Sequence, residues 1–332
     1  MTDNPLRFCQ FGAGRIGQIH AANLTRHPDA ELICIVDRDA EAAETLARRH
    51  GAMTTSAEEA LADDTIGAVV IASSTDTHAD LVEASARAGK AIFCEKPIDL
   101  SAERVEQCLG VVSEHAVPLL VGFNRRFDPS FAALKARVDA GDIGKVEMVS
   151  ITSRDPGLPP LSYLESSGGM FRDMMIHDLD MARWLMGEDP VQVFAYGGCL
   201  VDPGVAEAGD VDTAVVVLKT ASGRMAQINN SRRAVYGYDQ RVEVLGSLGM
   251  VQAGNRTPTS VEVATAQTTE VDNPLHFFLE RYTDAYRLEL DAFIQAVRSG
   301  RDPEPGGEDG RIGLRLADAA LESHLSGKPV DL

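Results

Sequence analysis

The sequence predicts an α/β protein with two domains: a doubly wound parallel sheet first, then an α/β domain with an open, mostly antiparallel sheet. Three observations support this. The first third alternates short apolar runs with helical patterns. A glycine-rich turn, Gly12 to Gly17, follows the first apolar run directly. Beyond about residue 123 the runs become β-branched and roughly alternating. With 332 residues, we expect a first domain at 1–122 and a second at 123–332.

The expected elements of the first domain come from runs that are apolar throughout, which is typical of strands buried on both faces of a sheet. Gly89 stops one helix and Ser101 can cap the next. Strands are expected at 6–11, 31–36, 68–72, 91–94 and 118–123, and helices at 15–26, 39–50, 76–88 and 101–115.

The second domain shows hairpin signals at Ser222-Gly223 and at Ser247-Leu248-Gly249. A stretch rich in Gly and Pro at 301–309 is expected to be a surface loop. Strands are expected at 145–153, 191–201, 211–220, 224–231, 240–245 and 261–265, and helices at 129–140, 169–187, 282–299 and 310–325.

Composition excludes several classes of protein. A formal net charge of -19 argues against nucleic acid and anionic membranes as partners. No apolar run approaches the length of a membrane span, and the first residues, Met1 to Pro5, lack the pattern of a signal peptide. The five cysteines are scattered without a CxxC pair, which indicates reduced thiols and a cytoplasmic location.

The turn Gly12-Ala13-Gly14-Arg15-Ile16-Gly17 follows a strand and opens a helix, the context that makes this motif informative. Gly12 permits the tight turn, Gly14 lets a pyrophosphate approach the backbone, and Gly17 lets helix and strand pack closely. The helix N-terminus, at Arg15 and Ile16, offers N–H groups to phosphates. The pattern predicts a Rossmann domain that binds a dinucleotide.

Asp37 ends the second expected strand, at the right distance to accept hydrogen bonds from a ribose diol. A carboxylate there repels a 2'-phosphate, so NAD is favoured over NADP. Arg38 follows directly and can blunt that repulsion or stack on adenine. How strictly the protein prefers NAD therefore stays open.

The segment Ser73-Ser74-Thr75-Asp76-Thr77-His78 follows the strand expected at 68–72, at the same sheet edge as Gly12. We expect Ser73, Ser74, Thr75 and His78 to line the nicotinamide half of the coenzyme. The same loop can also cap the next helix through Thr75 or Asp76, and a lone histidine is more often packed than catalytic.

Glu95-Lys96-Pro97 follows the next apolar run. Pro97 restricts Lys96 to extended backbone, and the sequence leaves open whether their peptide bond is cis. At the carboxyl edge of the sheet, the ammonium of Lys96 can reach both coenzyme and substrate and stabilise an alkoxide as hydride leaves. Glu95 can position Lys96 or the nicotinamide carboxamide.

Asp173 and His177 stand four residues apart, on one face of an expected helix. A carboxylate beside an imidazole raises its proton affinity and orients it, as a general base for a hydroxyl proton requires. The alternatives are a solvated Asp–His pair and a metal site formed with Asp178. One histidine with carboxylates is a poor zinc set, so no metal is expected.

Together, these motifs resemble the glucose–fructose oxidoreductase and inositol dehydrogenase family, over essentially the whole chain. Sharper matches to the members that oxidise inositol lie at 122–129, 152–157 and 236–239. The resemblance implies NAD-dependent oxidation of myo-inositol to 2-keto-myo-inositol (scyllo-inosose) in a homotetramer. It makes Lys96, Asp173 and His177 the catalytic residues, with His177 as proton acceptor. Candidate substrate contacts are Asn124, Asp155 and Tyr236, with Lys96, Asp173 and His177.

The substrate is the part of this interpretation with open alternatives. Another inositol isomer (scyllo or D-chiro) or an aldose such as glucose would be oxidised in the same way. A dinucleotide-binding sensor without turnover is the alternative from another class. The Lys, Asp and His set argues against it, because a sensor needs no proton acceptor.

Overall fold

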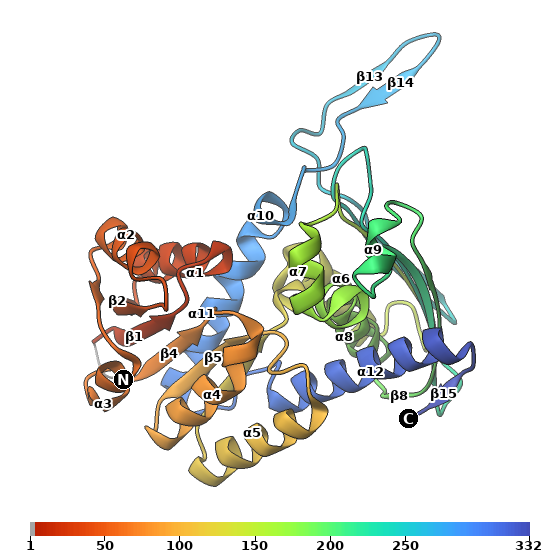
Figure 1. Cartoon of the computed structure of the whole chain (residues 1–332). Coiled ribbons are helices and arrows are strands. Elements are labelled where there is room, and N and C mark those ends of the chain that lie inside the picture. Colours follow the sequence, from red (N-terminus) through yellow and green to blue (C-terminus); the bar gives the residue numbers. More distant parts are fainter. Residues whose placement is uncertain (1–3) are drawn as a thin grey trace. The chain divides into compact units, whose positions relative to one another are not determined.

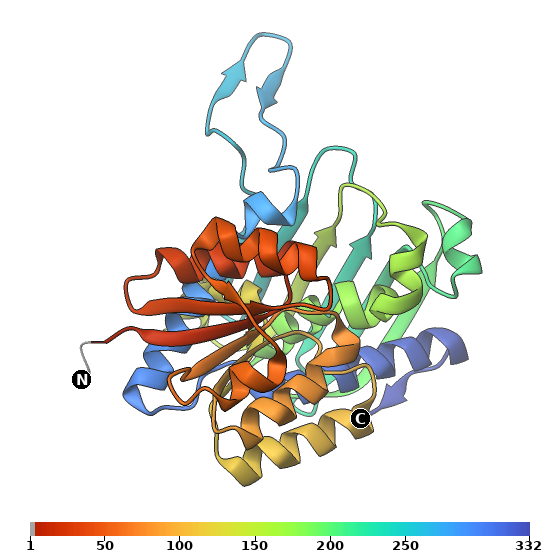
Figure 2. The ribbon, with the colours of Figure 1, turned by 60° about the vertical axis from the view of Figure 1, so that its left-hand side comes forward.

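The computed structural model describes residues 4–332 and divides them into two compact units (Figures 1 and 2). The first unit runs to Asn124 and also takes in 285–314; the second comprises 125–284 and 315–332. The first division lies two residues beyond the expected boundary, and the chain later returns to the first unit for thirty residues (285–314).

The first unit is built on a six-stranded parallel sheet in the order β3-β2-β1-β4-β5-β6. Helices α1 and α2 lie on one side of it and α4 and α5 on the other (Figure 1), the doubly wound arrangement that the sequence predicts. The strands are β1 (Leu6–Phe11), β2 (Ala30–Val36), β3 (Met53–Thr54), β4 (Ala68–Ile71), β5 (Ala91–Glu95) and β6 (Leu119–Gly122).

The helices of this unit follow their expected ranges closely, and α1 (Arg15–Arg26) agrees with its range at both ends. Ser101 caps α5 by accepting a hydrogen bond from the N–H of Arg104. The short α3 and β3 were not expected. The other helices are α2 (Ala40–His50), α3 (Ala57–Ala62), η1 (Thr75–Thr77), α4 (His78–Arg87), α5 (Ala102–His115) and α11 (Thr283–Ser299).

The segment expected as a surface loop at 301–309 is partly buried instead. Pro303 and Pro305 are buried, and the carbonyl of Pro305 accepts a hydrogen bond from the N–H of Val121 at 2.9 Å. Helix α12 (Gly307–Ser326) begins earlier than expected. The segment therefore closes one edge of the first sheet, beside β6.

The second unit is built on a seven-stranded sheet in the order β12-β11-β7-β10-β9-β8-β15. β7 and β10 pair in parallel, and the other described pairs of this sheet are antiparallel. The mostly antiparallel sheet is thus confirmed. Its strands are β7 (Val146–Arg154), β8 (Pro190–Gly198), β9 (Thr213–Thr220), β10 (Met225–Ser231), β11 (Asp239–Gly246), β12 (Gly249–Ala253) and β15 (Val330–Asp331).

The helix expected at 169–187 is two elements. A π-helical turn, η3 (Met170–Met174), precedes α8 (Ile176–Met186), and the N–H of Met175 bonds the carbonyl of Met170 at 2.8 Å. The expectation that Asp173 and His177 share one regular α-helix is therefore wrong, since the change of pitch falls between them. The other helices are η2 (Asn124–Phe127), α6 (Pro129–Asp139), α7 (Leu161–Ser167), α9 (Gly204–Glu207) and α10 (Phe278–Arg281).

The strand expected at 261–265 belongs to a separate hairpin rather than to the main sheet. β13 (Glu262–Ala264) pairs only with β14 (Thr269–Val271) among the described strands, and the hairpin projects from the unit (Figures 1 and 2). Among residues 4–332, no helix combines the length and the apolarity that crossing a membrane requires.

A buried polar cluster lies inside the first unit. His20 of α1 and Glu289 of α11 are fully buried, and the ring Nε2 of His20 lies 2.7 Å from Oε1 of Glu95. Neither carboxyl oxygen of Glu289 has a hydrogen-bond partner among the described residues. Burial, and then the charge of Glu95, raise the pKa of Glu289 well above its usual value, which favours the neutral form of this carboxyl group.

Glu289→Gln tests that protonation state, because the amide matches a neutral carboxylic acid. A pKa raised in the folded state stabilises the fold at low pH, and this contribution is lost as the pH rises toward the folded pKa. The amide of the glutamine variant cannot ionise, so the variant does not lose this stability as the pH rises. We therefore expect the melting temperature of Glu289→Gln, relative to the unsubstituted protein, to rise from about pH 5 to about pH 8. The exposed Glu207→Gln is the matched control. A constant destabilisation by Glu289→Gln at every pH would show an ionised Glu289.

Gly17→Ala and Gly14→Ala separate the packing role of the glycine turn from its ligand role. A Cβ on Gly17 would lie 2.2 Å from the carbonyl oxygen of Gly12, whereas a Cβ on Gly14 meets nothing within 4 Å. We expect Gly17→Ala to lower the free energy of unfolding by about 2 kcal/mol or more. Gly14→Ala should keep the stability and weaken NAD binding, because its methyl group occupies the space expected for the pyrophosphate. Thermal melts and NAD titrations measure both effects; equal stability of the two variants would contradict the packing argument.

Candidate active site

The glycine turn is held at the carboxyl edge of the first sheet. The side-chain amide of Gln10 donates to the carbonyls of Gly12 and Gly17, both at 2.8 Å. Gly12 has φ +103°, and a Cβ on it would lie 2.3 Å from the carbonyl oxygen of Ala72. No side chain caps the N-terminus of α1 at Gly14. The first turn of this helix, at Arg15 and Ile16, therefore presents N–H groups and a partial positive charge.

Asp37 connects the turn to the end of β2. Its Oδ2 accepts the N–H of Ala13 at 2.6 Å, and its Oδ1 accepts the N–H of Asp39 at 2.8 Å. Each carboxylate oxygen keeps a further lone pair, so the group can still accept from a ribose diol. Arg38 is exposed beside it.

The loop after β4 is joined to the turn after β5 by His78. This residue is 2% exposed, its Nδ1 lies 2.8 Å from the carbonyl oxygen of Pro97, and its Nε2 lies 3.1 Å from that of Ser73. Both ring nitrogens face main-chain carbonyls, so His78 connects the backbone at Ser73 to the backbone at Pro97. Ser74 is exposed, and Thr75 begins the short helix η1.

Glu95 and Lys96 stand at the end of β5. Glu95 is 8% exposed, and Lys96 is half-buried. The Lys96–Pro97 peptide bond, which the sequence left open, is cis. A Cβ on Gly122 of β6 would lie 3.0 Å from Oε2 of Glu95. The Glu95 carboxylate is thus confined between His20 and the backbone of β6.

In the second unit, Asp173 and His177 flank the change from η3 to α8, and both are half-buried. Oδ1 of Asp173 accepts the hydroxyl of Tyr163 at 3.1 Å. Arg172, just before Asp173, donates to Asp318 of α12 at 2.5 Å. These bonds fix the π-helical turn from two sides.

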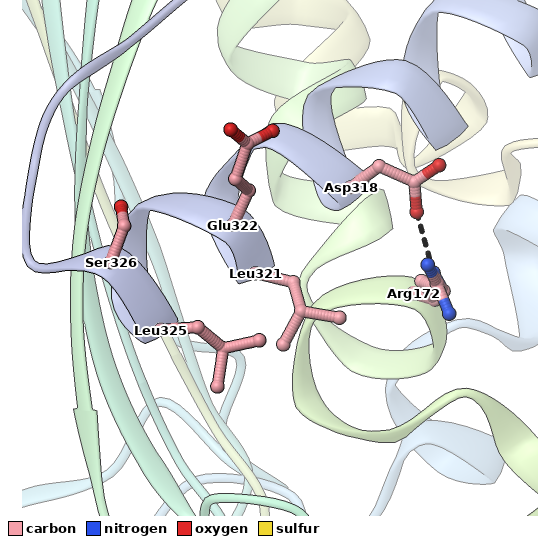
Figure 3. Close-up of a pocket in the computed structure, with 6 residues that line it drawn as sticks. All are labelled: Arg172, Asp318, Leu321, Glu322, Leu325 and Ser326. Carbon is pink, nitrogen blue, oxygen red and sulfur yellow. Dashed lines mark hydrogen bonds and ion pairs between the residues drawn. The ribbon is translucent and has the colours of Figure 1, made fainter.

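Arg172 and Asp318 border an open groove of about 460 Å³ whose other lining residues come from α12 (Figure 3). The groove is lined by Arg172, Asp318, Leu321, Glu322, Leu325 and Ser326. None of the sequence-predicted site residues lines it.

Asp155 and Tyr236 also belong to the second unit. The side chain of Asp155 is 19% exposed, and burial raises its pKa to about 6, opposed by the charges of Arg232 and Arg125. The Tyr236 hydroxyl accepts from Arg154 at 3.0 Å and donates to Asp239 at 2.7 Å. Asn124, the last residue of the first unit, is 3% exposed.

Asp178 has a structural partner, which argues against the metal interpretation of Asp173, His177 and Asp178. The fully buried Asp178 pairs with Arg125 and accepts from Asn230 at 2.8 Å. Among the described residues, the group that brings potential ligands within 4.8 Å of one another is His20, Glu95 and Glu289. This group lies inside the first unit and includes none of Asp173, His177 and Asp178.

Two residues of the second unit, Arg232 and Asp210, were not predicted from the sequence. Arg232 is 2% exposed, and its guanidinium lies within 4.0 Å of carboxylate oxygens of Asp155, Asp173 and Asp210. Arg232 directly follows β10, but only the parallel pairing of β10 with β7 places it beside Asp155, and that pairing has no local signal in the sequence. No local pattern marks Asp210.

Some of the predicted residues are brought together within each unit. The predicted coenzyme loops follow neighbouring strands at one edge of the first sheet, and in the second unit Asp155 and Asp173 both lie within 4.0 Å of Arg232, which was not predicted. Lys96 lies in the first unit and Asp173 and His177 lie in the second, so their convergence stays a prediction.

Two family models match the chain. The description "Oxidoreductase family, NAD-binding Rossmann fold" matches residues 6–123, and "Oxidoreductase family, C-terminal alpha/beta domain" matches residues 135–332. The inositol 2-dehydrogenase of Rhizobium meliloti is 55% identical over 98% of this chain and 99% of that protein. The myo-inositol 2-dehydrogenase of Thermotoga maritima is 47% identical over 98% of each chain.

A solved structure, described as a putative myo-inositol dehydrogenase from Sinorhizobium meliloti, aligns with a TM-score of 0.95 and 52% identity, covering 98% of this chain and 99% of that one. The motifs, the two folds and these likenesses agree over nearly the full length. The chain therefore belongs to the glucose–fructose oxidoreductase and inositol dehydrogenase family of NAD-binding oxidoreductases.

Proposed function

We propose that this protein is an NAD-dependent dehydrogenase that oxidises myo-inositol to 2-keto-myo-inositol (scyllo-inosose), in inositol catabolism. The observation that carries the proposal is the nearly full-length likeness to inositol 2-dehydrogenases, in a chain that keeps the glycine turn, Lys96, Asp173 and His177. The coenzyme would be held by the first unit and the substrate mainly by residues of the second.

The residues at the edge of the first sheet fit NAD. The uncapped N-terminus of α1 and the open space beside Gly14 suit a pyrophosphate, and Asp37 suits a ribose diol. When bound, NAD supplies the hydride acceptor. Ser73, Ser74 and Thr75 would border its nicotinamide half, while His78 shapes their loop through Pro97 and Ser73.

His177 would accept the proton of the reacting hydroxyl, and Asp173 would orient its ring and stabilise the imidazolium that forms. Lys96 would donate to the reacting oxygen and stabilise its developing negative charge. Asp155, Asn124 and Tyr236 would bind the remaining hydroxyls of the substrate. Buried hydroxyl groups need such partners, because an unpaired one costs about 1–3 kcal/mol.

Scyllo- or D-chiro-inositol is the second candidate substrate, since the same groups would oxidise any ring alcohol of this shape. The higher identity to relatives named for inositol 2-dehydrogenation favours myo-inositol. A cytoplasmic location fits the five cysteines of the chain, which are all thiols in the structure.

A tetramer is supported by the outward face of the second sheet. Helices α8 and α12 lie on one side of it (Figure 1). On the other face, Tyr196 pairs with Val215 and Phe194 with Val217 in adjacent strands. Tyr196 is 64% exposed, and Val215 and Val217 are 47% and 41% exposed. An apolar sheet face of this kind calls for a cover, and a second copy of the chain supplies it.

Turnover is tested by NADH absorbance with NAD and a panel of myo-, scyllo- and D-chiro-inositol and glucose. We expect the highest kcat/KM with myo-inositol. Lys96→Ala should lower kcat by about 100-fold or more, as loss of an oxyanion-stabilising donor does. The exposed Lys328→Ala is the control and should keep wild-type turnover. Tight NAD binding without NADH production on any polyol would instead support the sensor.

Val217→Asp tests the assembly, because a carboxylate at the centre of a covered face would be desolvated without a partner. Light scattering after gel filtration should give the mass of four chains for the unsubstituted protein and a smaller mass for Val217→Asp. Met53→Asp, at an exposed position of the first unit (66%), should remain tetrameric. A monomeric unsubstituted protein would refute the proposed assembly.

A further inference from the structure

Arg232 is the cation of an acidic cluster in the second unit. Its Nη1 lies 4.0 Å from Oδ2 of Asp155, and its Nη2 lies 3.9 Å from Oδ2 of Asp173 and 4.0 Å from Oδ2 of Asp210. Its side chain is 3% exposed. A buried guanidinium thus faces three carboxylates, two of which the proposed function places at the substrate.

The backbone determines this arrangement. β7 and β10 run in parallel, with Ser231 opposite Arg154, so Arg232 and Asp155 are each the first residue beyond neighbouring strands. The N–H of Asp155 bonds the carbonyl of Ser231 at 2.9 Å, and the N–H of Ala234 bonds the carbonyl of Asp155 at 2.7 Å. The two side chains therefore leave the same edge of the sheet.

Arg232 acts on the carboxylates by charge rather than by hydrogen bonds. Its Nε and Nη2 have no hydrogen-bond partner among the described residues, and neither has Oδ2 of Asp210. The other carboxylate oxygens are held elsewhere: Oδ1 of Asp210 accepts the N–H of Met170 at 2.8 Å, and Oδ1 of Asp173 accepts the Tyr163 hydroxyl at 3.1 Å. Structural bonds thus keep the acids in place, which leaves the guanidinium to compensate their charge.

The charges around Asp155 are unbalanced. The pKa of Asp155 is raised to about 6 in total. Burial raises this pKa most, Arg232 and then Arg125 lower it, and Asp173 and Asp178 raise it. Arg125 is already paired with Asp178, so Arg232 is the main counter-charge for Asp155. Asp173 and Asp210 share the same guanidinium. Removing it would raise the pKa of Asp155 further and favour its protonated form.

We propose that Arg232 is a positioning residue: its charge keeps Asp155 ionised, so that Asp155 can accept a substrate hydroxyl, and it lies against Asp173, which supports His177 as proton acceptor. This role rests on the proposed function. The proposal makes Arg232 necessary for activity at neutral pH, although its side chain is buried whereas those of Asp155 and Asp173 are partly exposed.

The test compares Arg232→Gln, which removes the charge, with Arg232→Lys, which keeps it. On the acidic side of the pH profile of kcat/KM, its acidic limb, activity depends on groups that must lose a proton, which here are Asp155 and His177 together. We expect Arg232→Gln to move that limb to higher pH by about 1 unit or more and to lower kcat/KM at neutral pH. Arg232→Lys should move it less. Arg233→Gln, at the exposed neighbour, should leave the profile unchanged.

A purely structural role would lower stability without moving the limb, so an unmoved limb in folded Arg232→Gln would overturn the proposal. Should Arg232→Gln not fold, Arg232→Lys carries the test: because lysine keeps the charge, a limb moved by about 1 unit or more in Arg232→Lys would overturn the proposal as well. NAD titration shows whether the first unit remains folded in each variant.

Stability separates failure of this inference from failure of the proposed function. If no inositol is oxidised, the proposed function fails, but the charge role of Arg232 can still be measured by thermal melts. If the loss of Arg232 raises the pKa of Asp155 in the folded protein further, the folded protein loses stability as the pH rises through that pKa. The melting temperature of Arg232→Gln should therefore fall further below that of the unsubstituted protein between about pH 5 and about pH 8, and that of Arg232→Lys should do so less. A constant difference would overturn the inference.

Discussion

Parallel pairing of strands is the constraint on which the candidate site depends. Parallel neighbours end at the same edge of a sheet, so the residues that follow them are brought together whatever their separation in sequence. In the first unit this gathers the glycine turn after β1, Asp37 after β2, Ser73 after β4 and Lys96 after β5. In the second unit β7 and β10 pair in parallel, and Asp155 and Arg232 follow them.

This dependence explains what could be predicted from the sequence. Strands buried on both faces have a local signature, so β1 and α1 were located to the residue and the glycine turn was placed correctly. The parallel pairing of β7 with β10 is not a local property, because seventy residues separate the two strands. Arg232 therefore looked like an ordinary polar residue after a strand, and its carboxylate neighbours could not be inferred.

The π-helical turn shows a second limit. A spacing of four between Asp173 and His177 suits a regular α-helix, but the backbone bond from Met175 to Met170 closes a wider turn. What holds that turn comes from elsewhere in the chain: Asp210 binds the N–H of Met170, and Asp318 binds Arg172. Neither contact could be read from the segment itself. Turns of this type often occur at functional sites.

The distribution of buried charge in the second unit favours an uncharged substrate. Asp128, Asp178 and Asp180 each have an arginine of their own, in Arg281, Arg125 and Arg126. Asp155, Asp173 and Asp210 share Arg232. The structural pairs are thus neutralised, whereas the cluster beside the proposed proton acceptor keeps excess negative charge. A sugar acid or sugar phosphate would be repelled there, while a polyol can donate hydroxyl hydrogens to the same carboxylates. The imbalance that makes Arg232 necessary for ionisation is therefore also suited to a neutral ring alcohol.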